Sequence, residues 1–339
     1  MAFPDPHDVV ARLRELQAAL RDAILASRDR SAEAMAAVER STSADTIYAI
    51  DALVEPILED FCRDWSRSTP LVLIAEGVEG PDGRECKTFP EGTAEADAVL
   101  RVIVDPIDGT RGLMYDKRPA WSLAAVAPNR GPGTRLRDCI VSVMTELPTT
   151  KMAYGDVAWA VRGEPSRAER VDLRTGSRRP LTLHPSRAQT LAHGFAMVSH
   201  FFPATKVQAG ELMNHLLRQL GGDDPTMATV FDDQYICTGG QFYNLASGQD
   251  RFNADVRPEL YRRAGLPDGG LCCHPYDVAG FLVAEQAGVV LTDPLGNPLD
   301  CPLDTTTGVS WVGYANAALR DRLSGAVAEF LRPYTPAGR

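Results

Sequence analysis

The sequence predicts an α/β protein whose N-terminal half is α+β and whose C-terminal half is α/β. Two segments with apolar residues at helical spacing open the chain, and several short β-branched or aromatic runs follow them. Strand-like and helix-like segments then alternate through the second half. The length of 339 residues suits two domains. We place the boundary so that residues 1–180 form an N-terminal domain and residues 181–339 form a C-terminal domain.

Two amphipathic helices are expected at the start of the chain. The first begins at Pro6 and continues through Met35 toward Arg40, where 41–43 interrupts it. Its apolar stripe consists of Val9, Leu13, Leu16, Leu20 and Ile24. The second runs from Asp45, which suits an N-cap, to Trp65. Its apolar stripe consists of Ile47, Ile50, Val54, Leu58 and Phe61.

Short apolar runs bounded by Gly, Pro or charged residues predict the strands of the first half. These runs are 71–75, 99–104, 121–127 and 139–144. The polar, glycine-containing segment 77–97 predicts a surface loop, and 151–161 predicts a hairpin that turns at 155–156. The basic segment 162–180 is interpreted as a linker between the two domains.

The second half alternates in type, which favours α/β layering. Strands are expected at 195–199, from 230 onward and at 289–291. Helices are expected at 209–220, 241–246 and 276–287.

Composition excludes several classes of protein. Apolar residues make up 44% and charged residues 24%, as in ordinary folded proteins. The 45 acidic residues outnumber the 35 basic ones, and the net charge of −10 disfavours a nucleic-acid ligand. The apolar runs fall short of the roughly 18 residues that span a bilayer. No secretory signal is visible, so we expect a cytoplasmic protein with no membrane partner.

The seven cysteines favour neither a disulfide framework nor a zinc ribbon, because their number is odd and no CxxC spacing occurs. They are interpreted as reduced thiols. Cys272, Cys273 and His274 are adjacent, but neighbours on an extended segment point to opposite sides and rarely chelate together. We expect ordinary strand or core residues there.

The segment 99–110 carries the strongest chemical signal. An apolar strand ends in Asp105 and Asp108, between which Pro106 fixes φ, and Gly109 permits a tight turn after them. Both carboxylates can then converge on a divalent cation, while the backbone N–H groups of Gly109 and Thr110 could hold a phosphate. The alternative interpretation is a β-turn with capping acids.

A related pattern, Asp-x-Asp-Gly-Thr, marks the haloacid dehalogenase phosphatases, whose first Asp is a covalent nucleophile. The two acids of this chain stand one residue further apart. That spacing disfavours a nucleophilic Asp105 and favours water directed by a metal as the attacking group.

Two separated signatures resemble a known superfamily. The first is Asp105-Pro-Ile-Asp-Gly-Thr110 followed by Pro119-Ala-Trp-Ser-Leu-Ala, and the second is Pro275-Tyr-Asp277-Val-Ala-Gly280 followed by Ala287-Gly288 and Asp293-Pro-Leu-Gly296. Together they resemble the inositol monophosphatase and fructose bisphosphatase superfamily of magnesium-dependent, lithium-sensitive phosphatases. The similarity spans about 45–300. It implies a layered α/β/α/β/α sugar-phosphatase fold with the site between the two halves.

The resemblance also implies roles for individual residues. The implied metal ligands are Glu76, Asp105, the carbonyl of Ile107, Asp108 and Asp277. Thr110, paired with Glu76, would orient and deprotonate the water, while the amides of Gly109 and Thr110 would hold the phosphate. Asp51 would help to hold a third metal and the water. The alternatives are an exposed helix carboxylate for Asp51 and an N-cap for Asp277.

Other positions depart from the family pattern or match it less closely. This chain has Gly77 where the family has a second acid that helps to bind a third metal ion. Glu79 is a candidate to supply the missing carboxylate. Asp255 falls, by ungapped counting, at the acid that binds substrate hydroxyls. Arg251, Asn253 and Arg111 are further candidates for substrate contacts. The alternative interpretation of Asp255, Arg251 and Asn253 is that they simply lie on a loop.

The cofactor implied by oxygen ligands is two or three Mg²⁺ ions, with Mn²⁺ as a substitute. Lithium and Ca²⁺ would inhibit by resemblance, and zinc is not expected because none of the six histidines belongs to the cluster. The expected substrate is a small sugar or cyclitol phosphate, and the expected assembly is a homodimer. Fructose bisphosphate and a 3′(2′),5′-bisphosphate nucleotide are alternative substrates. A catalytically idle regulatory protein is the alternative of another class.

Overall fold

The computed structural model describes residues 3–27, 38–41, 46–78, 80, 86–220, 226–267 and 270–332. Its larger sheet has eight strands in the order β10-β9-β8-β7-β6-β5-β3-β4. The strands, in chain order, are β3 (Leu71–Ala75), β4 (Cys86–Phe89), β5 (Leu100–Asp108), β6 (Ala120–Pro128), β7 (Val141–Leu147), β8 (Tyr154–Val161), β9 (Arg167–Asp172) and β10 (Arg178–Leu181). All neighbouring pairs are antiparallel except β3 and β5, which are parallel.

The second sheet has five strands in the order β12-β11-β13-β15-β14. They are β11 (Gly194–Val198), β12 (Val230–Phe231), β13 (Asp250–Asp255), β14 (Val290–Thr292) and β15 (Trp311–Tyr314). The helices are α1 (Pro6–Ala26), α3 (Ala49–Trp65), α4 (Thr110–Met114), α5 (Lys206–Leu220), α6 (Thr238–Ala246), α7 (Arg257–Arg263), α8 (Phe281–Ala287) and α9 (Ala317–Leu331). Short strands β1 (Val38–Ser41) and β2 (Thr46–Tyr48) pair antiparallel.

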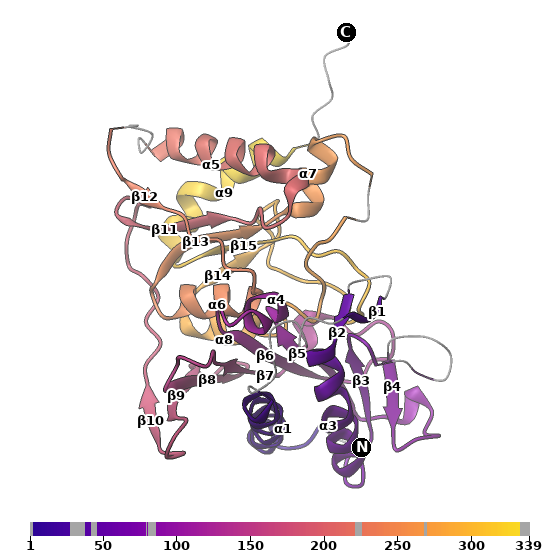
Figure 1. Cartoon of the computed structure of the whole chain (residues 1–339). Coiled ribbons are helices and arrows are strands. Elements are labelled where there is room, and N and C mark those ends of the chain that lie inside the picture. Colours follow the sequence, from indigo (N-terminus) through magenta and orange to yellow (C-terminus); the bar gives the residue numbers. More distant parts are fainter. Residues whose placement is uncertain are drawn as a thin grey trace.

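The elements stack in five layers (Figure 1). Helices α1 and α3 pack on one face of the larger sheet, and α6 and α8 lie between its other face and the smaller sheet. Helices α5, α7 and α9 cover the outer side of the smaller sheet. This α/β/α/β/α order is the layered arrangement that the sequence predicted, and it confirms the expected fold class.

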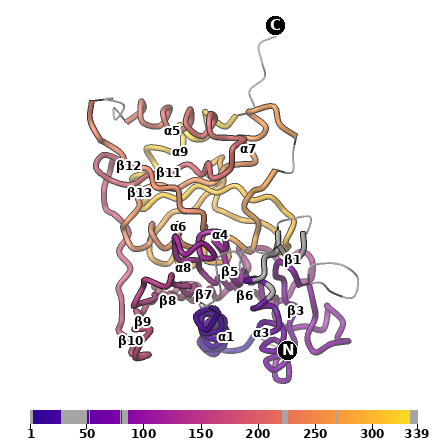
Figure 2. The backbone as a smooth tube through the Cα atoms, in the orientation of Figure 1, coloured from indigo at the N-terminus to yellow at the C-terminus, as the bar shows by residue number. Residues whose placement is uncertain are grey.

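Alternating side chains of β5 hold the layers together. Leu100, Val102 and Val104 are fully buried in the core that faces α1 and α3, whereas Ile103 belongs to the core on the opposite side. Burial on both faces explains why this strand is an almost unbroken apolar run. Figure 2 shows the backbone passing from the first half into the second and then back toward the first half through its orange segments, which carry α8.

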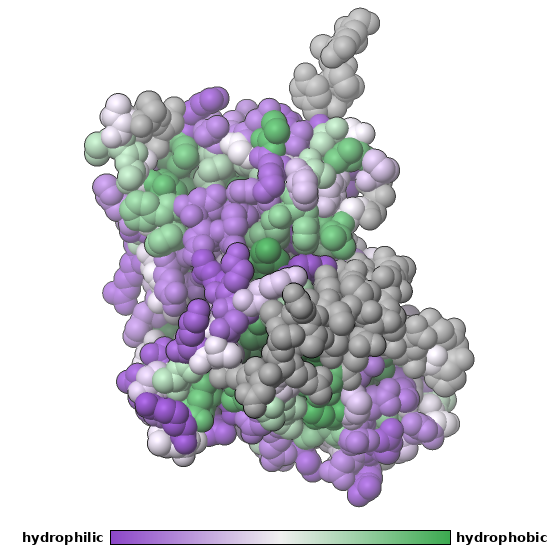
Figure 3. Space-filling model, in the orientation of Figure 1, coloured by the Kyte–Doolittle hydropathy of each residue, from purple (hydrophilic) through white to green (hydrophobic). Residues whose placement is uncertain are grey.

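The surface is of mixed character. On the face shown in Figure 3, hydrophilic residues predominate and hydrophobic ones lie in small groups among them. None of the described helices combines the length and the hydropathy that crossing a bilayer requires.

The first helix is shorter than predicted, because α1 ends at Ala26 and 38–41 forms strand β1. Apolar spacing stops after Ile24, and the Ser27 hydroxyl donates to the Ile24 carbonyl at 2.8 Å, which competes with a further helical turn. The second helix begins at Ala49, since 46–48 pairs as β2 with β1. The predicted N-cap Asp45 lies outside the described residues.

Three predictions between the first strand and the linker are wrong. The segment 77–97 contains β4, an edge strand that pairs with β3. The expected hairpin is the single strand β8, in which Gly155 pairs with Val171 and Asp156 with Arg170. The linker 162–180 forms β9 and nearly all of β10. Charged pairs across the strands let polar sequences form sheet there.

The second half follows the prediction more closely, with some omissions. Helix α8 begins at Phe281 rather than at 276, so Asp277 precedes it in a turn. Strands β13 and β15 and helices α7 and α9 were not predicted. The larger sheet ends at Leu181 and the smaller one begins at Gly194. The division into two domains stays a prediction.

Candidate active site

The site begins where two parallel strands end side by side. Strand β3 pairs with β5 so that Ala75 lies opposite Val104, and Glu76 and Asp105 follow directly at the same sheet edge. The register with β6 is irregular between Asp105 and Asp108. This bulge lets both acids of the sequence Asp-x-x-Asp face the same region, whereas regular strand geometry would turn residues three apart to opposite faces.

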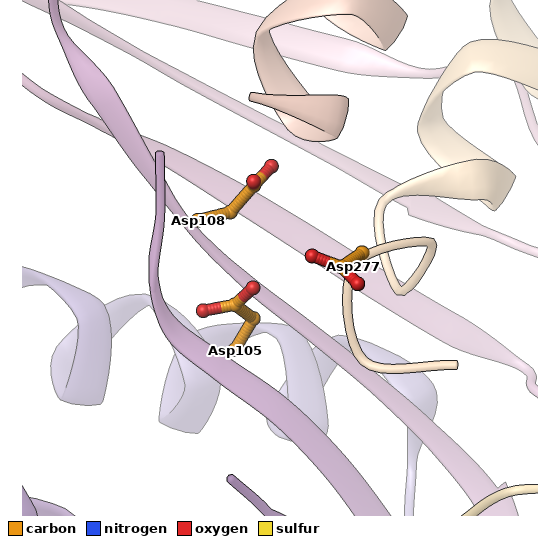
Figure 4. A group of neighbouring side chains, drawn as sticks. All are labelled: Asp105, Asp108 and Asp277. Carbon is orange, nitrogen blue, oxygen red and sulfur yellow. The ribbon is translucent and has the colours of Figure 1, made fainter. Parts of the chain in front are cut away.

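The third acid comes from the other end of the chain. Asp277 lies in the turn before α8, and Figure 4 shows its carboxylate close to those of Asp105 and Asp108. One carboxylate oxygen from each residue lies within 4.8 Å of the others. The structure therefore brings together the three aspartates that the sequence signatures singled out.

Backbone N–H groups fix these carboxylates in place. The N–H of Ile107 donates to Asp105 at 3.0 Å, and the N–H of His274 donates to Asp277 at 2.6 Å. Asp108 accepts from the N–H groups at the start of α6, those of Thr238 and Gly239, at 3.2 and 2.5 Å. The acids are thus oriented by the backbone before any cation binds.

The electrostatics of the cluster favour a cation. Burial, reinforced by the charges of Asp108, Asp277 and Glu76, raises the pKa of Asp105 well above its ordinary value. Burial also raises the pKa of Asp108 to about 7, with Asp277 contributing, and raises the pKa of Asp277 to about 6. Like charges held this close repel one another, and a bound divalent cation would remove that cost. Oxygen-only donors fit a hard cation such as Mg²⁺ or Mn²⁺.

Thr110 lies beside the acids at the start of α4. Gly109 precedes it with φ of 93°, a left-handed conformation, and a β-carbon there would lie 2.9 Å from that of Cys237. The Thr110 hydroxyl lies 2.7 Å from the Ile107 carbonyl and 3.2 Å from Asp51 Oδ1, and either oxygen can accept its one hydrogen. The prediction paired Thr110 with Glu76, and the structure shows Asp51 as a partner, which places α3 against the site.

A pocket of about 80 Å³ joins most of the predicted residues. Its wall includes Glu76, Asp105, Ile107, Asp108, Gly109, Thr110, Arg111 and Asp277. Glu79, the candidate substitute for a missing acid, lies outside the described residues. The predicted residues in this wall thus include the four carboxylates Glu76, Asp105, Asp108 and Asp277 and the hydroxyl of Thr110.

Three predicted substrate contacts do not line this pocket. Asp255 is fully buried and both of its carboxylate oxygens accept from Arg257. Asn253 is fully buried and donates to Asp250 at 2.8 Å. Arg251 donates to the carbonyls of Thr190 and Ala192. All three lie on β13, and the partners of their side chains are Arg257, Asp250 and backbone carbonyls.

Several pocket residues were missed by the sequence analysis. They include Phe201, Phe202, Cys237, Thr238, Arg257 and His274. Their sequence positions carry no motif, since they come from a loop before α5, the start of α6, the start of α7 and the turn before Asp277. Cys273 is a core residue that pairs with Val309 in an isolated bridge, as expected for 272–274, while Cys272 and His274 also line the pocket. The Nδ1 atom of His274 lies 3.1 Å from the Thr307 carbonyl.

Comparisons with known proteins identify the fold. Fructose-1,6-bisphosphatase of Leishmania major has a TM-score of 0.67 and 11% identity, covering 94% of this chain and 93% of that one. The extragenic suppressor protein SuhB of Bartonella henselae has a TM-score of 0.62 and 16% identity, and the match covers 94% of this chain and 98% of that one. A Pyrococcus horikoshii protein described as similar to inositol-1 monophosphatase has a TM-score of 0.61 and 13% identity, and the match covers 97% of this chain and 99% of that one.

The sequence matches no protein-family model and no curated protein. The structural likeness, which extends over nearly the whole length of both chains, nevertheless defines the architecture. The chain has the fold of the inositol monophosphatase and fructose bisphosphatase superfamily. The structural neighbours named above include a fructose bisphosphatase, and the described site contains an acidic cluster that could hold a metal.

Proposed function

We propose that the chain is a Mg²⁺-dependent phosphomonoesterase that hydrolyses a small sugar or cyclitol phosphate, in the manner of an inositol monophosphatase. The observation that carries the proposal is the convergence of Asp105, Asp108 and Asp277 within 4.8 Å, in a pocket that also holds Glu76 and Thr110. The fold, which is shared with phosphatases of this superfamily, supports the same reaction class.

In this proposal the acids hold the metal. Glu76, Asp105, Asp108, Asp277 and the Ile107 carbonyl would hold two or three Mg²⁺ ions, for which Mn²⁺ could substitute. Bound there, the cations would lower the pKa of a water molecule and offset the charge of the phosphate. The N–H groups of Gly109 and Thr110 would bind phosphate oxygens.

The remaining residues would direct the attacking water. The hydrogen of the Thr110 hydroxyl points to the Ile107 carbonyl or to Asp51, which leaves a lone pair of the hydroxyl oxygen to accept from water. Glu76 or Asp51 would take the proton of that water, and no covalent intermediate on the protein is required.

The proposal extends to the setting of the enzyme. We propose a cytoplasmic homodimer that is inhibited by lithium and whose partner is a small phosphorylated metabolite. The family resemblance in the two sequence signatures supports these properties. Size-exclusion chromatography with light scattering would test the dimer, and a lithium titration of phosphate release would test the inhibition.

Phosphate release with and without Mg²⁺ tests the proposed function. Wild-type protein should release phosphate from a panel of sugar and cyclitol phosphates with Mg²⁺ and lose this activity in EDTA. Asp105→Asn should reduce turnover by about 10³-fold or more, since it removes a charge that holds the cation. Asp321→Asn is the matched control, because Asp321 is an exposed carboxylate on α9 paired with Arg320.

The result also separates the enzyme from a catalytically idle protein of the same fold. A folded wild-type protein that releases no phosphate from any member of the panel would contradict the proposal. An Asp105→Asn variant as active as the Asp321→Asn control would contradict the assignment of the site.

A further inference from the structure

Arg257 places a buried guanidinium in the wall of the pocket that holds the acidic cluster. Its side chain is only 8% exposed. The Nε and Nη2 groups donate to Asp255 at 2.8 and 2.7 Å, and Nη1 donates to the Leu271 carbonyl at 3.1 Å. These contacts hold the guanidinium in one orientation.

The fixed guanidinium keeps donors available. An Arg side chain has five N–H donors, and the bonds to Asp255 and Leu271 engage three of them. Within the described part of the chain, one N–H on each terminal nitrogen is therefore left over. A buried donor without a partner costs free energy unless a ligand or a water molecule accepts a hydrogen bond from it.

Two aromatic rings confine this group to the pocket. The guanidinium carbon lies 5.5 Å from the ring centres of both Phe201 and Phe202, and the same Phe202 ring lies 5.6 Å from the guanidinium carbon of Arg111. All four residues line the pocket with the acids. The pocket thus has a cationic, aromatic side in addition to its carboxylate side.

The character of this side differs from the sequence expectation. Asp255 was predicted to accept hydrogen bonds from substrate hydroxyls, but both of its oxygens are turned to Arg257. The pocket wall therefore contains a guanidinium, paired with Asp255 and with N–H groups left to donate, where an acceptor was expected. A guanidinium can only donate, and it matches the planar oxygens of carboxylate and phosphate.

We propose that Arg257 is a specificity-determining residue that binds a second anionic group, a phosphate or a carboxylate, on the alcohol part of the substrate. The inference rests on the proposed phosphatase function and narrows its substrate class. The acids and Mg²⁺ would take the phosphate that is hydrolysed, and Arg257 would select substrates that carry another oxyanion.

Two matched pairs of substrates test this selection. Fructose 1,6-bisphosphate and fructose 1-phosphate differ only in the second phosphate, and 2-phosphoglycerate and glycerol 2-phosphate differ in a carboxylate against a hydroxymethyl group. Wild-type protein should show a kcat/KM about tenfold to hundredfold higher for the doubly anionic member of at least one pair, as a charge-assisted hydrogen bond predicts. The substrate pair that shows the preference reveals whether Arg257 binds a phosphate or a carboxylate.

The variants remove the guanidinium without leaving a buried charge. The double variant Asp255→Asn with Arg257→Gln should lose the preference mainly through a higher KM for the doubly anionic substrate, and its kcat/KM should fall far less for the singly anionic one. Arg257→Lys, which keeps the charge but not the planar fork, should recover part of the preference. Arg262→Gln is the control, since Arg262 is an exposed arginine on the same helix, paired with Glu259. Melting temperatures check that each variant is folded.

Calorimetry provides a readout that does not depend on turnover. Fructose 6-phosphate, which keeps the second phosphate, should bind wild-type protein at least tenfold more tightly than fructose, and the double variant should lose this difference. Equal losses for both members of each substrate pair, or no preference in the wild type, would overturn the inference. If wild-type protein releases phosphate from none of these four substrates and from no member of the sugar and cyclitol phosphate panel, the proposed function fails, and binding of fructose 6-phosphate still decides the role of Arg257.

Discussion

At the scale of single residues, the site consists of polar groups that are held by the backbone and by one another. Asp108 illustrates this, since the start of α6 donates to it from two N–H groups. Sequence reasoning could find Asp105 and Asp108 because they follow an apolar strand in a spaced motif, and it found Asp277 through the second signature of the family resemblance. It could not find Arg257, because no pattern shows that Asp255 pairs with a residue two positions later instead of with the substrate.

Thr110 provides the first prediction at this scale. Thr110→Val keeps the shape of the side chain but removes the hydroxyl that contacts Asp51 and Ile107. We expect kcat to fall by about 10²-fold or more, as for the loss of a group that positions a proton transfer, while Thr110→Ser stays within about tenfold of wild type. Steady-state kinetics of phosphate release measures both variants. Equal activity of Val and Ser variants would exclude a role for the hydroxyl.

At the scale of elements, strands that are apolar on both faces were predictable and polar strands were not. Strand β3 is buried along its whole length and its limits match the prediction. Strand β8 contains Gly155-Asp156, which suggests a turn, but the carboxylate of Asp156 is paired with Arg170 on β9 and with Tyr243 on α6. The pairing depends on residues far apart in sequence, so local propensity gave the wrong answer.

The neighbouring strand β7 carries Glu146, which predicts a pH effect on stability. Burial raises the pKa of Glu146 from 4.5 to about 7, although the Asp156 N–H and the charge of Arg170 oppose the shift. The folded state therefore binds more protons than the unfolded state between these values. The contribution of Glu146 to stability is most favourable below pH 4.5 and is lost as the pH rises to about 7.

Glu146→Gln should remove this dependence, because the neutral amide keeps the volume and still accepts from the Asp156 N–H. Relative to the variant, wild-type protein should lose up to about 2–3 kcal/mol of unfolding free energy between pH 5 and 8. Urea unfolding of both proteins across this range measures the difference. Parallel curves for the two proteins would show that Glu146 has an ordinary pKa.

At the scale of the whole molecule, the acidic cluster joins the two halves of the chain. Asp105 and Asp108 end a strand of the larger sheet, whereas Asp277 follows the smaller sheet's strand β13 and precedes α8. The sequence indicated the five-layer order through the family resemblance. It did not supply β15 and α9, whose short or weakly amphipathic sequences carry little local signal.

A cation bound between the halves should stabilise the fold. Ligand that binds only the folded state adds about 2.7 kcal/mol at a hundred times its dissociation constant. Saturating Mg²⁺ should therefore raise the melting temperature of wild-type protein by about 2–5 °C. Asp277→Asn should lose most of this shift, and the Asp321→Asn control should keep it. Differential scanning calorimetry measures the shift, and an undiminished shift in Asp277→Asn would place the cation elsewhere.

We infer that Asp105, Asp108 and Asp277 share a divalent cation that serves phosphate-ester hydrolysis. The most direct test is an anomalous-difference map from a crystal soaked with Mn²⁺ and inorganic phosphate. We expect at least one strong peak within bonding distance of all three carboxylates, with phosphate density between the metal and the N–H groups of Gly109 and Thr110. A map without a peak among these aspartates, at a Mn²⁺ concentration that supports turnover, would contradict it.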